Sequence, residues 1–130
     1  MTRKTLRRLD ATEADTLRVI CDYLDVQQRQ GKLLYIRHNP PMMTSKRVGG
    51  KTKVIFKKVR ETQLGAPDVI VFRKILPPFG WHYTDVFCLE VKSAEGRQSN
   101  DQYLWAQRAI NQGCQYLIVR SLEEVIEALK

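Results

Sequence analysis

Two carboxylates and a lysine stand at the ends of two short apolar runs in this sequence. Asp68 precedes the run 69–72, and Glu90 follows the run 86–89, with Lys92 two residues further on. A divalent cation held by carboxylates activates water and neutralises the charge of a phosphodiester, and magnesium prefers such oxygen ligands. A nearby ammonium group stabilises the negative charge that develops on phosphorus. These residue types therefore suggest metal-assisted hydrolysis of a phosphodiester.

Both apolar runs have the length and composition of buried β-strands. Because side chains alternate along a strand, Glu90 and Lys92 project from one face, and Val91 projects from the other. Each fragment alone has a commoner explanation, since an aspartate after a proline is usually a turn residue and a Glu-x-Lys pair is usually a surface ion pair. The ordered combination, separated by about one hairpin, is much more specific.

A predicted helix over residues 12–28 carries a further carboxylate, Glu13, in its first turn. Counting back four residues from Leu17 places Glu13 on the apolar stripe, facing the core and available to the site. The residue also suits a plain structural role, because an acidic side chain behind a Thr12 cap complements the helix dipole. Periodicity alone leaves both interpretations open.

A second predicted helix spans residues 100–112 and has Gln102 in its first turn, on the same face as Trp105. Ser99 and Gln102 have the spacing of a capping box, in which each side chain bonds to the backbone of the other residue. Gln102 therefore serves the cap alone, or both the cap and the carboxylate site.

Several motifs together resemble the VRR-NUC nucleases of the PD-(D/E)xK superfamily, most closely the small stand-alone forms of bacteriophages. The resemblance covers about residues 12–128 and is carried by Thr12-Glu13, Gly65-Ala66-Pro67-Asp68, Glu90-Val91-Lys92, Gly96-Arg97, Ser99 to Gln102, and Gly113 to Ser121. It implies one nuclease domain over 1–130 with a restriction-endonuclease-like core. Gln98, where the family usually has an apolar residue, and the Pro-rich segment 73–84 depart from the family pattern.

The resemblance also implies a metal-dependent DNA endonuclease that uses Mg²⁺ or Mn²⁺, selective for branched, flap or junction DNA. Four residues would provide metal ligands, the last through its backbone carbonyl: Glu13, Asp68, Glu90 and Val91. Lys92 would assist the attacking water, and Gln102 would support the site. Stand-alone relatives resemble junction resolvases that work as dimers, so the resemblance implies a homodimer, and a phage protein would work in the cytoplasm of its bacterial host.

Charge is distributed unevenly along the chain, whose formal net charge is +8. Residues 26–60 include ten basic side chains and no acidic one, a pattern that attracts polyanions but also occurs on solvated surfaces. The candidate nucleic-acid contacts are Arg37, Lys46, Arg47, Lys51, Lys53, Lys57, Lys58 and Arg97. The basic residues of segment 1–9 form either a phosphate-binding arm or an untethered terminus.

The predicted fold class is α/β, with a central mixed β-sheet flanked by helices and the order α-β-β-β-β-α-β-α. Residues 38–50 are predicted as a loop and residues 53–59 as an edge strand. The three isolated cysteines suit free thiols in a reducing cytosol, and no apolar stretch is long enough to span a membrane.

Two other functions compete with DNA cleavage. The chain suits a nucleic-acid-binding module that keeps a nuclease fold without cutting, although burying carboxylates around one point costs free energy unless a cation compensates. It also suits an enzyme acting on RNA, because nothing in the sequence discriminates through the 2′-hydroxyl.

Overall fold

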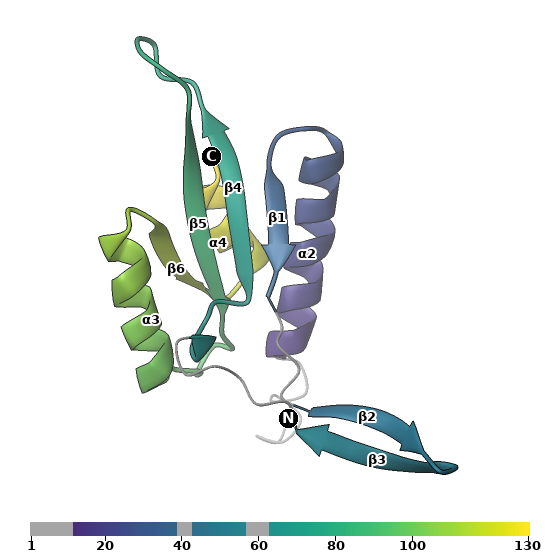
Figure 1. Cartoon of the computed structure of the whole chain (residues 1–130). Helices are drawn as coiled ribbons and strands as arrows, with labels where there is room; N and C mark the ends of the chain where they lie inside the picture. The colour runs from purple at the N-terminus through teal and green to yellow at the C-terminus, as the bar shows by residue number, and fades with distance from the viewer. Residues whose placement is uncertain (1–11, 39–42, 57–62) are drawn as a thin grey trace, which may run out of the picture.

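The computed structural model of this chain describes residues 12–38, 43–56 and 63–130, with the backbone alone described for 43–46 and 53–56. The described elements, in chain order, are α2 (Glu13–Arg29), β1 (Leu34–Arg37), β2 (Met43–Val48), β3 (Lys51–Phe56), β4 (Val69–Ile75), β5 (Tyr83–Val91), α3 (Asn100–Asn111), β6 (Gln115–Val119) and α4 (Leu122–Ala128). They form an α/β fold with a mixed four-stranded sheet flanked by helices, which confirms the predicted α/β class (Figure 1). The predicted element order is wrong by one strand, because it lacks β2.

The four-stranded sheet has the order β1-β4-β5-β6 and is mixed, as predicted. β4 pairs antiparallel with both β1 and β5, whereas β5 and β6 are parallel. Because β4 and β5 run in opposite directions, the start of β4 meets the end of β5, and Val69 lies opposite Leu89. This register brings Asp68 and Glu90 to the same end of the sheet.

Segment 43–48 is a strand, so the prediction of a loop over residues 38–50 is wrong for this part. β2 and β3 pair antiparallel and form a separate two-stranded sheet, called here the basic ribbon. The strands are joined by Gly49 and Gly50, whose φ angles of 59° and 78° are both positive. Two adjacent glycines with positive φ are typical of a two-residue hairpin turn, a signal that the expected loop overlooked.

Apolar side chains of α2, α4 and one face of the sheet form the main core. Ile20 and Leu24 of α2 and Val125 of α4 are fully buried. They pack against side chains of the strands, of which the buried ones are Val69, Val71, Phe87, Leu89, Val91 and Val119. The alternation predicted for β5 is therefore confirmed, since Phe87, Leu89 and Val91 face this core and Glu90 does not.

Helix α3 packs on the other face of the sheet. Its Trp105 ring lies 6.5 Å from the ring of Tyr116 on β6, whereas the neighbouring Leu117 packs against the α2 core. Side chains at successive strand positions point to opposite faces, so helices lie on both sides of the sheet. Glu90 is on the side of α3.

Side-chain caps begin each of the three helices in the described part of the chain. Thr12 accepts a hydrogen bond from the backbone N–H of Asp15, and Ser121 accepts one from that of Glu124. A Ser, Thr, Asp or Asn cap satisfies one of the backbone donors left unpaired in a first turn.

The hairpin between β4 and β5 projects beyond the sheet at the end opposite Asp68 (Figure 1). Its tip carries two apolar side chains that are almost fully exposed, Phe79 at 92% and Trp81 at 91%. No helix in the described part of the chain is long and apolar enough to cross a membrane.

Candidate active site at the end of β4 and β5

Asp68 holds the backbone of the neighbouring strands at this end of the sheet. Asp68 Oδ2 accepts a hydrogen bond of 2.8 Å from the backbone N–H of Val91. The carbonyl of Asp68 accepts a second bond of 2.8 Å from the N–H of His38, just after β1. Asp68 therefore connects three neighbouring strands at the point where its side chain meets the end of β5.

Glu90 is the centre of the site and is almost completely buried, with 2% of its surface exposed. Its Oε1 accepts a 2.6 Å hydrogen bond from Nε2 of Gln102 and lies 3.7 Å from the Lys92 ammonium nitrogen. Its Oε2 is buried and has no hydrogen-bond partner among the residues that the structure describes. A buried carboxylate oxygen without a donor is costly, so this atom is suited to a ligand that supplies positive charge.

Gln102 makes both of the contacts that the sequence left as alternatives. Its Oε1 accepts a 2.8 Å bond from the N–H of Ser99, and Ser99 Oγ accepts from the N–H of Gln102, which completes the capping box. The amide nitrogen at the other end of the same side chain donates to Glu90. The cap therefore fixes the position from which Gln102 reaches the carboxylate.

A glycine lets helix α3 approach the Asp68 turn closely. Gly65 has a φ of +82°, and a Cβ at this residue would lie 2.2 Å from the Asp101 carbonyl oxygen and 2.6 Å from the Gln102 nitrogen. Both distances are far shorter than any van der Waals contact. Only glycine fits here, and its lack of a side chain sets how near Gln102 comes to the strand that follows Asp68.

The electrostatics of the site favour a neutral Glu90 in the absence of a cation. Burial and, second to it, the nearby charge of Asp68 together raise the pKa of Glu90 to about 8, although the charge of Lys92 opposes both effects. The charge of Glu13 also raises this pKa. Two carboxylates in a partly desolvated place disfavour double ionisation, which is the situation that a bound cation reverses.

Glu13 does not face the core, so this prediction is wrong. The buried stripe of α2 consists of Thr16, Ile20 and Leu24, and Glu13 lies on the exposed first turn. Its charge still affects the pKa of Glu90, which shows that its side chain is not remote from the site. Within the described ranges, no three His, Cys, Asp or Glu side chains are gathered closely enough to hold a metal ion. Asp68 is therefore the carboxylate with the larger effect on Glu90, and Glu13 lies further out on the exposed first turn of α2.

Arg120 is a residue of this region that sequence reasoning did not single out. Its guanidinium donates to the carbonyl of Gly96 at 2.8 Å and also to the carbonyl of Ser93. Both carbonyls belong to the turn directly after Lys92, so the arginine braces that turn from β6. No sequence signal reveals this contact, because its acceptors are backbone atoms more than twenty residues away.

The candidate nucleic-acid contacts are spread over three places. Arg37 at the end of β1 and Arg97 between β5 and α3 are exposed. Arg47 and Lys51 are exposed beside the turn of the basic ribbon, and Lys46 and Lys53 lie opposite each other in its register. Lys57 and Lys58 lie outside the described residues, as does the segment 1–9.

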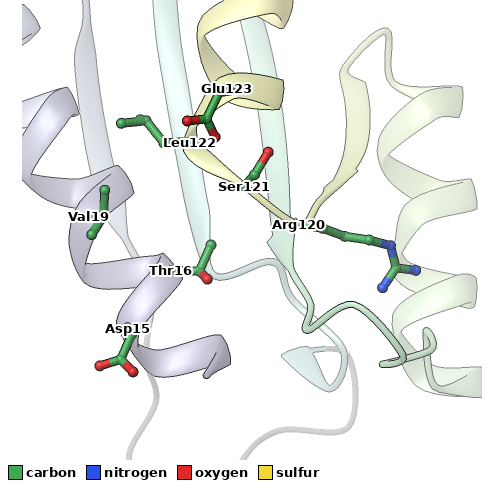
Figure 2. A pocket seen from close by; sticks show the side chains of 7 residues that line it. All are labelled: Asp15, Thr16, Val19, Arg120, Ser121, Leu122 and Glu123. Carbon is green, nitrogen blue, oxygen red and sulfur yellow. The ribbon is translucent and has the colours of Figure 1, made fainter. Parts of the chain in front are cut away.

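The best-formed pocket lies apart from these carboxylates (Figure 2). It has a volume of about 260 Å³ and lies between α2, with Thr16 and Val19, and the junction of β6 with α4. Figure 2 shows the Arg120 side chain at its margin, pointing away from α2. None of Asp68, Glu90 and Lys92 lines this pocket, so it is separate from the carboxylate site at the sheet end.

A scan against protein-family models, a search of the curated proteins and a search of the solved structures each returned no match.

Proposed function

We propose that this protein is a divalent-metal-dependent DNA endonuclease whose active site is formed by Asp68, Glu90, Lys92 and Gln102. The observation that carries the proposal is the buried Glu90 carboxylate, which has one oxygen without a partner among the described residues and lies beside Asp68 and Lys92. A purely structural glutamate at this place would be more stable as an apolar residue.

The donor set suits magnesium or manganese. Two carboxylates provide hard oxygen ligands, and magnesium commonly takes only one or two carboxylates while keeping several waters for substrate to replace. The backbone carbonyl of Val91 would complete the protein ligands, and Asp68 holds the N–H of the same residue. Glu13 is exposed, so its carboxylate would contribute to metal binding from the outer side of the site. When bound, the cation would neutralise the phosphodiester and lower the pKa of a water molecule.

The other side chains have roles that follow from their contacts. The Lys92 side chain is only 12% exposed, and its ammonium group would orient the attacking water or stabilise charge on the phosphoryl oxygens. Gln102 would hold Glu90 in the orientation that leaves Oε2 free for a ligand. These roles agree with those implied by the resemblance to VRR-NUC nucleases.

The substrate class and assembly are further parts of the proposal. A domain of 130 residues has limited surface for reading base sequence, which favours selection of DNA shape, such as flaps or junctions. Paired cuts at a two-fold junction require two active sites, so we propose a homodimer. A solution mass near 15.1 kDa by light scattering would contradict the dimer without affecting the site.

A binding module that does not cut is the second candidate. It is favoured by one observation, namely that no third acidic ligand joins Asp68 and Glu90 within the described residues. Isothermal titration with Mg²⁺ separates the two candidates without any cleavage assay. The nuclease proposal predicts a binding heat that disappears in Asp68→Asn, whereas a module without a metal site produces no such heat.

Cleavage assays test the proposal directly with matched controls. Labelled duplex, flap, four-way-junction and RNA substrates are incubated with Mg²⁺, Mn²⁺ or EDTA. Lys92→Met and Glu90→Gln should each lower the rate by about 10²-fold or more, because each removes a charged group from the site. The exposed Lys74→Met and Glu95→Gln, which make the same chemical changes elsewhere, should cut normally. Equal rates in all four variants would refute the assigned site, and faster cleavage of RNA than of DNA would refute the substrate.

A further inference from the structure

The basic ribbon concentrates positive charge on two short strands. Its strands pair only with each other among the described strands, and within residues 46–53 stand the four cations Lys46, Arg47, Lys51 and Lys53. The register places Lys46 directly opposite Lys53. No acidic residue occurs between positions 26 and 60 to balance these charges.

This arrangement is unfavourable for the ribbon by itself. Like charges directly opposite each other on paired strands are destabilising, by up to about 1 kcal/mol for each pair. A two-stranded sheet without further packing is at best marginally stable in water. Both costs are reversed by a polyanion that neutralises the lysines and arginines, so the ribbon has the properties of a surface that binds one.

The chain connects the ribbon to the site end of the sheet on both sides. The segment with the ribbon leaves β1 after Arg37 and returns to β4 through Asp68, and Arg37 lies opposite Val69 in the sheet. The backbone bond between His38 and Asp68 closes this insertion at its base. Five residue steps separate His38 from Met43, the first residue of β2, so the Cα atoms of these two residues are at most about 18 Å apart. The base of the ribbon is therefore tied to the end of the sheet that holds Asp68.

We propose that the basic ribbon inserts into the major groove of a DNA duplex that flanks the bond to be cut. The major groove is about 12 Å wide and accepts a two-stranded β-ribbon, which the minor groove, about half as wide, does not. The ribbon's turn consists of Gly49 and Gly50, so no side chain at the tip prevents close approach to the base edges. This inference rests on the proposed DNA endonuclease function and adds that its substrate carries a double-stranded arm.

Binding measurements without metal test the ribbon separately from catalysis. The variant is Arg47→Gln/Lys51→Gln, and the control is Lys74→Gln/Arg108→Gln, which removes the same charge from exposed positions on β4 and α3. Fluorescence anisotropy in EDTA gives the dissociation constant for a labelled duplex and for a single strand of equal length, over a range of salt concentrations. The loss of two phosphate contacts should lower the salt slope for duplex by about 1.8.

The ribbon variant should bind duplex at least about tenfold more weakly, and the control variant should stay within about twofold of the wild type. Binding to the single strand should change no more in the ribbon variant than in the control. Equal duplex affinity of the two variants would overturn the proposal, and so would an equal loss for single strand, since a groove exists only in duplex.

Chemical protection locates the groove. The N7 atom of guanine lies in the major groove, so methylation of N7 by dimethyl sulfate should be suppressed by the wild type and restored by Arg47→Gln/Lys51→Gln. Duplex binding with unprotected N7 atoms would overturn the major-groove placement. Failure of the endonuclease proposal would appear elsewhere, as unchanged cleavage in Lys92→Met, and would leave the metal-free binding result intact.

Discussion

Gly65→Ala should disturb the contact between Gln102 and Glu90 while leaving the overall fold in place. The added Cβ would lie 2.2 Å from the Asp101 carbonyl oxygen, whereas an ordinary contact begins near 3.4 Å. The neighbours are backbone atoms of helix α3 and cannot rotate away, so the start of the helix must move by about 1.2 Å. Such a movement would lengthen the bond between Gln102 and Glu90 from 2.6 Å to about 3.8 Å. That distance is beyond the range of a hydrogen bond.

The stability cost has two parts that a matched control separates. Alanine with a positive φ costs about 1–2 kcal/mol from backbone strain, and overpacking adds about 1–3 kcal/mol. Gly113, just beyond the other end of α3, has a φ of +90°, and no atom lies within 4 Å of the point that a Cβ would occupy there. Gly113→Ala therefore carries the strain without the clash. We expect Gly65→Ala to be the more destabilised of the two in urea unfolding.

Activity and the Gln102 contact complete the assay. At a temperature where both variants are folded, Gly65→Ala should cut DNA at least about tenfold more slowly than Gly113→Ala. The side-chain amide resonances of Gln102 should shift in Gly65→Ala alone, a readout that does not depend on catalysis. Equal unfolding free energies together with unshifted Gln102 resonances would refute the close approach of α3 to the Asp68 turn.

Three further expectations follow from burial and capping. Because the pKa of Glu90 is raised from 4.5 to about 8, the folded protein retains a proton that the unfolded chain releases. Without metal, the contribution of Glu90 to the free energy of unfolding should therefore be complete below about pH 4.5 and should be lost as the pH rises through about 8. Urea unfolding over this pH range should show the decline in the wild type but not in Glu90→Gln. An equally steep decline in the variant would contradict the assignment to Glu90. Ser99→Ala removes the cap of α3 and should cost about 1 kcal/mol, measured by thermal unfolding; no change would show that Gln102 alone suffices. Phe79→Ser/Trp81→Ser should alter the unfolding free energy by less than about 0.5 kcal/mol, because both rings are exposed; a larger loss would indicate hidden packing.

Local patterns in the sequence predicted the elements that carry the site. Thr12 and Ser99 cap their helices because a cap depends only on residues within one turn. The apolar runs after Asp68 and before Glu90 are strands, and alternation correctly separates Glu90 from Leu89 and Val91. Side chains repeat every two residues along a strand and every 3.6 residues along a helix, so these patterns can be recognised in a short window of sequence.

Predictions that depended on geometry beyond one turn were less successful. Periodicity placed Glu13 on the core stripe, but the first turn of α2 is exposed and the stripe begins at Thr16. The strand 43–48 was missed because its polar and basic composition resembles a loop, and only the turn at Gly49 and Gly50 indicates a hairpin. The burial of Glu13 is decided by neighbours from elsewhere in the chain, whereas β2 pairs with β3, which follows directly after Gly49 and Gly50.

The sequence by itself determined which residues are available for chemistry, the strands and helices that bear them, and the concentration of positive charge before Asp68. Only the tertiary structure decided that Gln102 reaches Glu90, that Gly65 admits the start of α3, and that Arg120 braces the turn after Lys92. It also left one oxygen of Glu90 buried without a partner among the described residues. Caps and alternation are set by near neighbours, whereas these contacts join segments 12 to more than 30 residues apart, whose meeting depends on how the whole sheet and its helices pack.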